Sequence, residues 1–195
     1  MKRTALTLGL AIVLVGLFQT RSDSETNLTE YKIDGSHSAV IFKVAHLGVS
    51  HTWGRFDSIE GSLKFRDSGE GASINVTVKA DSINTGNAKR DGHLRSPDFF
   101  STKEFPTITF ASKSWKKTGD GTFAVTGDLT LHGVTKSVTI AVTKVGEGKD
   151  PWGGFRVGFD GVLKIKRTEF GMTKMVGAAG DEVTLHIAIE GMRKA

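Results

Sequence analysis

The stretch FRVGFDGVLKIK, from Phe155 to Lys166, alternates between apolar and polar residues over its whole length. In an extended chain, Phe159 and Leu163 fall on one side, and Asp160 and Lys164 fall on the other. Alternation with a period of two, rich in aromatic and branched residues, is typical of a β-strand with one buried face. This stretch therefore predicts a long strand at the wall of a core.

The same alternation recurs along most of the chain. It is present in SINVTVKA (73–80), TITF (107–110), TFAVTGDLTL (122–131), SVTIAV (137–142) and EVTLHIAIE (182–190). Glycine-rich turns at 67–71, 118–121 and 146–148 separate successive segments at hairpin distances, which predicts a mostly antiparallel sheet. Glycines inside the strands, such as Gly127 and Gly161, indicate sharp bends. Bent strands with one apolar face favour a closed barrel over the alternative, a two-layer sandwich.

Two segments depart from the pattern. In GRFDSIEGSLKF (54–65), Phe56 and Ile59 fall out of phase, which a β-bulge near Asp57 and Ser58 would correct. In SAVIFKVAH (38–46), both faces are mostly apolar, so we expect another element to cover the outer face.

The N-terminus has the order of a secretory signal peptide. A cationic start is followed by an uncharged apolar run at 4–18, too short for a comfortable membrane span of ~20 residues, and then by a polar stretch. We expect residues 1–24 to be a signal peptide and 25–195 to be a single domain; an uncleaved anchor is the alternative. The chain has no cysteine, and its net charge of +5 is too small and scattered to indicate nucleic-acid binding.

The inward side of the predicted strands forms an apolar lining without acids or lysines. Its members are Phe42, Val44, Val76, Phe110, Phe123, Leu129, Phe159 and Ile187. A barrel of about eight strands either encloses one small ligand or is filled by its own side chains. A hollow barrel with this lining would suit a hydrophobic molecule; a filled core is the alternative.

The stretch RDGHLRSPDFF (90–100) interrupts the strands with a predicted helical insert at about 87–103. Asn87 is the expected N-cap, a second short helix is expected to restart at Ser96, and the phenylalanines would anchor the insert on the barrel. The cationic residues Arg90, His93 and Arg95 have two interpretations. They either pair with Asp91, Asp98 and Glu104 or receive an anionic head group.

Six histidines are present, and none has the spacing of a helical metal motif. His37, His46, His93 and His132 lie near predicted element ends and would meet if those ends shared one barrel mouth. Local hydrogen bonding is the simpler interpretation, and we predict no metal site and no catalytic residue. The motifs of serine hydrolases, P-loops and dinucleotide-binding folds are absent from the sequence.

Five segments together resemble the YceI family. They are HSAVIFKVAHLGVSHTWGRF (37–56), RDGHLRSPDFF (90–100), FPTITF (105–110), GDLTLHGVTKSV (127–138) and RTEFGM (167–172), within a match that covers about 31–191. The resemblance implies an all-β fold, an eight-stranded antiparallel lipocalin-like barrel with a helical insert, in the bacterial periplasm. It also implies a polyprenyl phosphate or diphosphate, or an isoprenoid quinone, held inside the barrel.

From the lining and the resemblance we expect a carrier or store of an isoprenoid lipid, with no cofactor, no catalytic activity and no stable membrane insertion. The tail-binding prediction adds Phe99, Phe100 and Phe170 to the lining, and the head-group prediction comprises His46, Arg90, His93, Arg95 and His132. Two alternatives stay open: an accessory enzyme or redox protein using the mouth histidines, and a filled barrel that binds another periplasmic protein. A homodimer is a further option.

Overall fold

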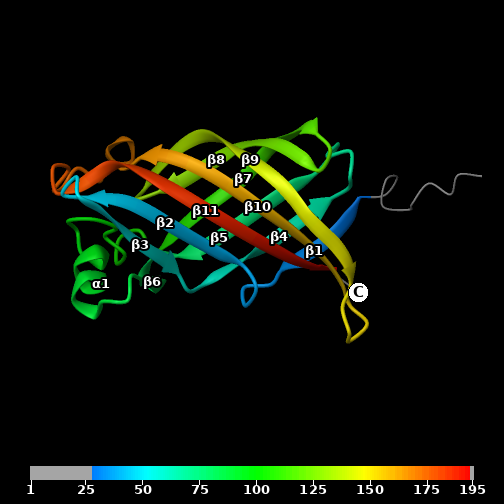
Figure 1. Ribbon diagram of the computed structural model, residues 1–195, viewed down its shortest axis with the longest axis horizontal. Helices are drawn as coiled ribbons and strands as arrows, with labels where there is room; N and C mark the ends of the chain where they lie inside the picture. Colours follow the sequence, from blue (N-terminus) through cyan, green and yellow to red (C-terminus); the bar gives the residue numbers. More distant parts are fainter. Residues whose placement is uncertain (1–27, 194–195) are drawn as a thin grey trace, which may run out of the picture.

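The computed structural model describes residues 28–193, so the expected signal peptide at 1–24 lies outside the described residues. The described part contains strands, one α-helix and two short 3₁₀ helices (Figure 1). The strands are β1 (Thr29–Ile33), β2 (Ala39–His46), β3 (Ser50–Phe56), β4 (Ile59–Phe65), β5 (Ser73–Lys79), β6 (Ile83–Asn84), β7 (Thr107–Gly119), β8 (Thr122–Leu131), β9 (Val134–Lys149), β10 (Phe155–Lys166) and β11 (Ala179–Arg193). The helices are η2 (Ala80–Ser82), α1 (Ala88–Arg95) and η3 (Arg167–Phe170).

The sheet closes on itself. From β1 it runs through β4, β5, β7, β8, β9 and β10 to β11, and the end of β11 pairs back with β1. Every pairing is antiparallel. The predicted eight-stranded antiparallel barrel is confirmed, and the sandwich alternative is wrong.

Interruptions divide three sides of the barrel into pairs of shorter strands, which are β1 with β2, β3 with β4, and β5 with β6. β1 and β2 share the strand β11, which pairs with β2 along its first part and with β1 at its end. β3 and β4 are separated at Asp57 and Ser58, where the bulge was predicted, and Phe56 and Ile59 are both buried. The interruption therefore returns both side chains to the interior, as the pattern required.

Inward and outward residues alternate as the opening stretch predicts. On β10, Val157, Phe159 and Leu163 are buried, and Asp160 and Lys164 are exposed. Gly127 on β8 has a packing role: a Cβ atom there would lie 2.7 Å from Cζ of Phe110 and 2.4 Å from the carbonyl oxygen of Ala111. The glycine thus makes room for an aromatic ring inside the barrel.

The predicted helix is confirmed at Ala88–Arg95, with Asn87 as its N-cap accepting a hydrogen bond from the Arg90 amide. The predicted second helix at Ser96 is wrong. After Ser96 the chain forms turns, with the amide of Phe100 bonded to the carbonyl of Leu94 and that of Ser101 to the carbonyl of Ser96. The left-handed backbone of Ser101 (φ 44°) prevents a further helical turn.

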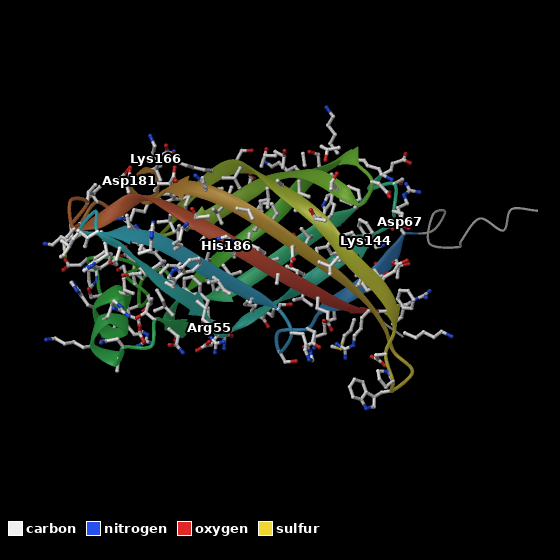
Figure 2. The ribbon with its side chains drawn as sticks, viewed as in Figure 1. Arg55, Asp67, Lys144, Lys166, Asp181 and His186 are labelled. Atoms are coloured by element: carbon white, nitrogen blue, oxygen red, sulfur yellow. The ribbon has the colours of Figure 1, made fainter. Side chains whose placement is uncertain are left out.

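We expected another element to cover the outer face of β2, and the helical insert, the one α-helix in residues 28–193, does not do so. α1 lies against β6 at one end of the barrel (Figure 1). On the outer face Ile41 stays exposed, and the ring of Trp53 from β3 stacks on His186 of β11, with centroids 5.7 Å apart. Figure 2 shows His186 in the middle of the barrel wall, away from the helix.

Candidate functional site

The barrel encloses two apolar cavities that follow one another along its axis. The central cavity has a volume of ≈ 110 Å³, and the insert-end cavity, beside the helical insert, has a volume of ≈ 120 Å³. Both are bordered by Val40, Val78, Ile108, Leu129 and Leu185. Because the two cavities share these five residues, they are adjacent parts of one apolar interior, and we call the region of the shared residues the waist.

The end of the barrel opposite the insert is closed by an aromatic floor, which comprises Phe65, Trp115, Phe123 and Phe159. Phe65 is the centre, with its ring centroid 4.7 Å from that of Phe159, 5.5 Å from that of Phe123 and 5.7 Å from that of Trp115. Most of these contacts are edge-to-face, the arrangement that aromatic rings prefer. Trp115 and Phe159 border the central cavity, so the floor limits how deep a guest can reach.

The other end is built from loops rather than strands. Leu94, Phe99 and Phe100 of the insert, and Met172 after η3, line the insert-end cavity. Phe99 is largely buried, and the ring of Phe100 contacts Phe56 edge-on at 5.6 Å between centroids. The insert is therefore the lid region of the apolar interior.

Arg167 is the only charged residue among those that line the insert-end cavity. Its guanidinium donates hydrogen bonds to the carbonyl oxygens of Met172 (2.6 Å), Ala179 (2.8 Å) and Gly180 (3.0 Å). It also lies 5.9 Å from the ring centroid of Phe99. Burial lowers the pKa of this guanidinium, which nevertheless stays protonated because an arginine pKa lies far above neutrality. A positive charge thus stands at the wall of a cavity that is otherwise apolar.

Most of the predicted tail-binding residues border the interior. The central cavity is lined by Val76, Phe110, Leu129, Phe159 and Ile187, and the insert-end cavity by Phe42, Val44, Phe99, Phe100 and Leu129. Phe123 and Phe170 line neither cavity: Phe123 belongs to the aromatic floor, and Phe170, the last residue of η3, is buried in a core cluster with Leu129 and Leu131. The role of the lining residues as lipid contacts stays a prediction.

The arginines predicted at the mouth are bonded to backbone carbonyls of the neighbouring connection. Arg90 donates to the carbonyl and hydroxyl oxygens of Thr85, and Arg95 donates to the carbonyls of Asp81 and Ile83. Neither arginine lines a cavity. The alternative interpretation, in which these arginines pair with nearby carboxylates, is also wrong, because neither guanidinium pairs with a carboxylate. Their hydrogen bonds join α1 to the segment that contains η2 and β6 instead.

The histidines are held by separate local partners. His93 lies 3.0 Å from a carboxylate oxygen of Asp98, so the predicted ion pairing holds for this residue. Nδ1 of His132 lies 3.0 Å from the carbonyl oxygen of Phe170, and its ring packs on Phe105. His46 is exposed at the end of β2. None of the three lines a cavity, and a head-group role for them stays a prediction.

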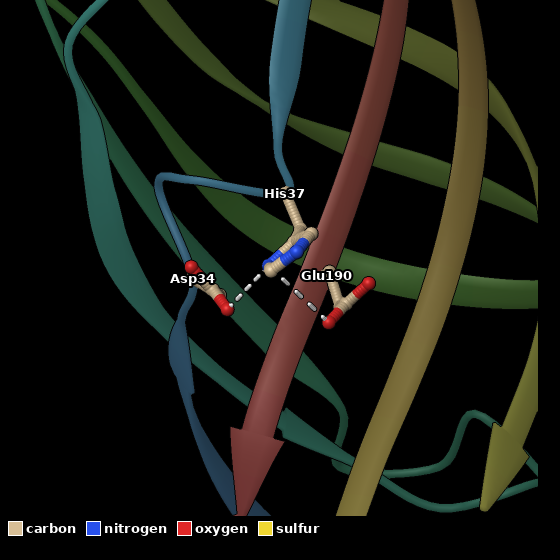
Figure 3. Close-up of side chains that lie close together, drawn as sticks. All are labelled: Asp34, His37 and Glu190. Atoms are coloured by element: carbon tan, nitrogen blue, oxygen red, sulfur yellow. Dashed lines mark hydrogen bonds and ion pairs between the residues drawn. The ribbon is translucent and has the colours of Figure 1, made fainter. Parts of the chain in front are cut away.

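The fourth histidine belongs to an ionic cluster at the junction of β1 and β2 (Figure 3). Asp34, His37 and Glu190 place one potential metal-ligating atom each within 4.8 Å of one another, the one such group in residues 28–193. Arg156 donates from one guanidinium nitrogen to both Asp34 and Glu190, and from another to Asp150. The cationic centre of the cluster is therefore an arginine, and the group is best described as an ion-pair network.

The pKa values in this network shift as the geometry requires. Hydrogen bonds from Ser36, His37 and Arg156 hold the pKa of Asp34 well below its usual range, although burial opposes this shift. Hydrogen bonds to Asp34, Glu190 and Asp150 raise the pKa of Arg156. The network thus favours the charged forms and joins the β1–β2 junction to β10 and β11.

Sequence reasoning missed Arg167 and Trp115. Arg167 precedes an acidic residue in RTEFGM and looks like one more surface cation. Trp115 lies in the polar stretch KSWKK, out of phase with Ile108 and Phe110, and reaches the interior because β7 has an irregularity between Ser112 and Ser114. The one indication in the sequence that this side chain faces the interior is the presence of a tryptophan among lysines.

Comparisons with known proteins agree with this architecture. The YceI-like domain family matches residues 31–191. A UPF0312 protein of Azotobacter vinelandii is 43% identical over 197 residues, covering 100% of both chains. BcnA of Burkholderia cenocepacia superimposes with a TM-score of 0.74 at 26% identity, over 81% of this chain and 98% of that one. A polyisoprenoid-binding domain from Saccharophagus degradans, 17% identical with a TM-score of 0.66 over 86% of this chain and 100% of its own, shares the fold. Across residues 28–193, no helix has the length and apolarity needed to span a membrane.

Proposed function

The chain belongs to the YceI-like domain family, and from this premise we propose that it binds an isoprenoid lipid inside its barrel, as a carrier or store rather than an enzyme. One observation carries the proposal: the barrel encloses two adjacent apolar cavities that share five lining residues, with the aromatic floor at one end. The neighbour from Saccharophagus degradans, described as a polyisoprenoid-binding domain, supports the choice of ligand.

The tail would be held by burial alone. Each CH₂ group removed from water contributes about 0.8 kcal/mol, so a tail of several isoprene units binds without polar contacts. Cavities of ≈ 110 and ≈ 120 Å³ in series suit a thin, jointed chain that passes the waist between them. A bulky rigid guest would need to push the shared wall apart.

The head group would lie at the insert end. Arg167 is the charged residue at that cavity wall, and three of its five N–H groups have backbone carbonyl partners. Its positive charge favours a head with anionic or strongly polar oxygens, such as a polyprenyl phosphate or diphosphate, or the ring oxygens of a quinone.

The observed side chains give less support to the alternatives. Of the histidines of the enzyme hypothesis, His37, His93 and His132 each have their own local partner, His46 is exposed, and none of the four lines a cavity. The filled-barrel hypothesis does not account for the two cavities. We also propose that the protein is periplasmic and that residues 1–24 direct its export; the mass of the purified mature chain and cell fractionation test this.

Mass spectrometry of an organic extract of the natively purified protein tests the proposed ligand. We expect a prenyl lipid, at a lipid-to-protein ratio that falls in a Leu129→Trp variant, because Leu129 borders both cavities and the larger ring fills the waist. Val162→Trp, at an exposed outward position of β10, is the matched control and should keep the ratio. Absence of any prenyl lipid from the wild-type extract would refute the proposal.

A further inference from the structure

Four large apolar residues are exposed on two loops at the insert end of the barrel. They are Leu47 (58% exposed) and Val49 (82%), between β2 and β3, and Met175 (48%) and Val176 (39%), between η3 and β11. We call these four residues the apolar rim. Both loops lie at the end of the barrel that carries α1 (Figure 1). Exposed apolar residues gathered in this way mark an interaction site more often than scattered ones do.

The two loops are joined into one surface. The amide of Leu47 donates to the carbonyl of Ala178 at 2.8 Å, and His46 pairs with Ala179 across β2 and β11. Leu47 (φ 53°) and Met175 (φ 55°) both have left-handed backbones, which large side chains seldom adopt. The rim is therefore a preformed patch whose apolar side chains stay in solvent at a conformational cost.

The rim is continuous with the apolar interior. The loop that carries Met175 and Val176 begins after Met172 and ends at Ala179, and both of these residues line the insert-end cavity. The rim therefore lies next to the wall of the insert-end cavity, where Arg167 bonds the carbonyls of Met172 and Ala179.

The charge around the rim favours an anionic surface. The stretches 43–53 and 172–180 contain Lys43, Lys174 and two histidines, and the acids that follow directly, Asp181 and Glu182, are bonded to Thr168 and Lys164. On α1, Lys89 is exposed, whereas the acid Asp91 is buried with its carboxylate bonded to Thr85. Asp98 offsets part of this charge through its pairs with His93 and Lys174.

We propose that the apolar rim docks the insert end of the barrel onto a lipid surface that carries anionic head groups. Apolar side chains beside cations are the combination that binds proteins at the interface of a bilayer. Docking in this orientation places the end of the barrel that holds the insert-end cavity against the membrane, which would shorten the path of a tail between bilayer and barrel. The benefit of docking rests on the proposed lipid-binding function, but docking itself needs no bound isoprenoid.

Flotation with vesicles of phosphatidylcholine and phosphatidylglycerol, free of isoprenoids, tests the proposal. The rim variant carries Leu47→Asn and Met175→Asn, because asparagine tolerates a left-handed backbone, together with Val49→Ser. The control variant carries Val145→Ser and Trp152→Ser, which remove two apolar residues of similar exposure (66% and 83%) at the opposite end. Thermal unfolding verifies that both variants fold.

We expect the wild type and the control variant to float with the anionic vesicles and the rim variant to bind at least about tenfold more weakly, since binding scales with buried apolar area. Flotation should decrease in 0.5 M salt or without phosphatidylglycerol. The proposal is overturned if the wild type does not float, or if rim and control variants float equally. It is also overturned if the rim mutations abolish only a dimer seen in sedimentation, which would identify a second copy as the occupant.

The outcome is separable from that of the ligand test. A wild-type extract without prenyl lipid, from a protein that still floats, refutes the ligand and leaves the docking surface in place. A wild-type protein that carries prenyl lipid but does not float refutes the docking surface and leaves the ligand proposal in place.

Discussion

The two ends of the barrel differ in secondary structure and in residue type. At the closed end, rigid strands bring four aromatic side chains into mutual contact, and Lys144 joins Asp67 and Glu147 above them. At the insert end, loops and a short helix surround a cavity, and an arginine bonded to three carbonyls holds the loops together. Figure 2 shows Asp67 and Lys144 together at one end and Lys166 and Asp181 at the other. The closed end limits the depth of the apolar interior, and the insert end covers it with loops and a helix.

The largest expected difference between the ends lies in their aromatic residues. Phe65→Ala, at the centre of the floor, should reduce the free energy of unfolding by about 3–5 kcal/mol, because the surrounding rings cannot close the void. Phe99→Ala should cost roughly half as much, because Phe99 already borders an empty cavity. Urea denaturation of both variants measures this difference, and equal losses would contradict the contrast.

Arg167 should be the most important polar residue at the insert end. Arg167→Met leaves three carbonyl oxygens without their donor, and we expect a loss of about 2–4 kcal/mol in the free energy of unfolding. Lys166→Met, one residue away and exposed, should change stability by less than about 0.5 kcal/mol. Chemical denaturation followed by circular dichroism compares the two; similar small losses would mean that the carbonyls find water instead.

The ionic network at the β1–β2 junction predicts a dependence of stability on pH. The pKa of Asp34 is lower in the folded state than in the unfolded state, so its contribution is complete above the unfolded pKa of about 4 and is lost as the pH falls below that value. Asp34→Asn should remove about 1–3 kcal/mol at neutral pH and flatten the decline of stability in acid.

The insert end offers the control for this prediction. The pKa of Asp98 is also lowered, mainly by the hydrogen bond from His93, but this carboxylate is exposed. Asp98→Asn should therefore change the acid slope less than Asp34→Asn does. Thermal unfolding between pH 7 and pH 3 tests both, and an unchanged acid slope in Asp34→Asn would argue against the network.

The smallest effect is expected from ion pairs on the outside of the two ends. Asp67→Asn removes a partner of the half-buried Lys144 and should cost about 1 kcal/mol at low salt, less as the salt concentration rises. Glu182→Gln breaks the exposed pair with Lys164 and should cost close to nothing. Denaturation at two salt concentrations separates them; a salt-independent loss for Asp67→Asn would identify a packing effect.

The architecture was predictable from the sequence because local patterns encode it. Alternation specifies which residues face inward, and the Asn87 cap specifies where α1 begins. The interruption at Asp57 and Ser58 was also predictable, because the apolar residues change from even to odd positions there, between Phe56 and Ile59.

The depth of a residue in the barrel is not encoded in the same way. Phe123 and Phe159 have the same inward parity, but only Phe159 borders a cavity, because position along the axis depends on how the strands are staggered. Similarly, nothing local distinguishes Arg167, at the cavity wall, from Arg90 and Arg95, which bind backbone carbonyls of residues 81–85. Tertiary packing determines which backbone carbonyls each of these arginines binds.

The closure of the barrel also has a consequence for its synthesis. Tyr31 pairs with Arg193, so the first strand of the domain finds one of its neighbours only in the last residues of β11. Until these fifteen residues of β11 are made, the chain can form at most a curved sheet with two free edges. Its apolar inner surface then stays exposed along the unpaired edges. Pairing between strands so distant in the sequence is slow, and the pairing of β11 with β1 would be the step that closes the barrel.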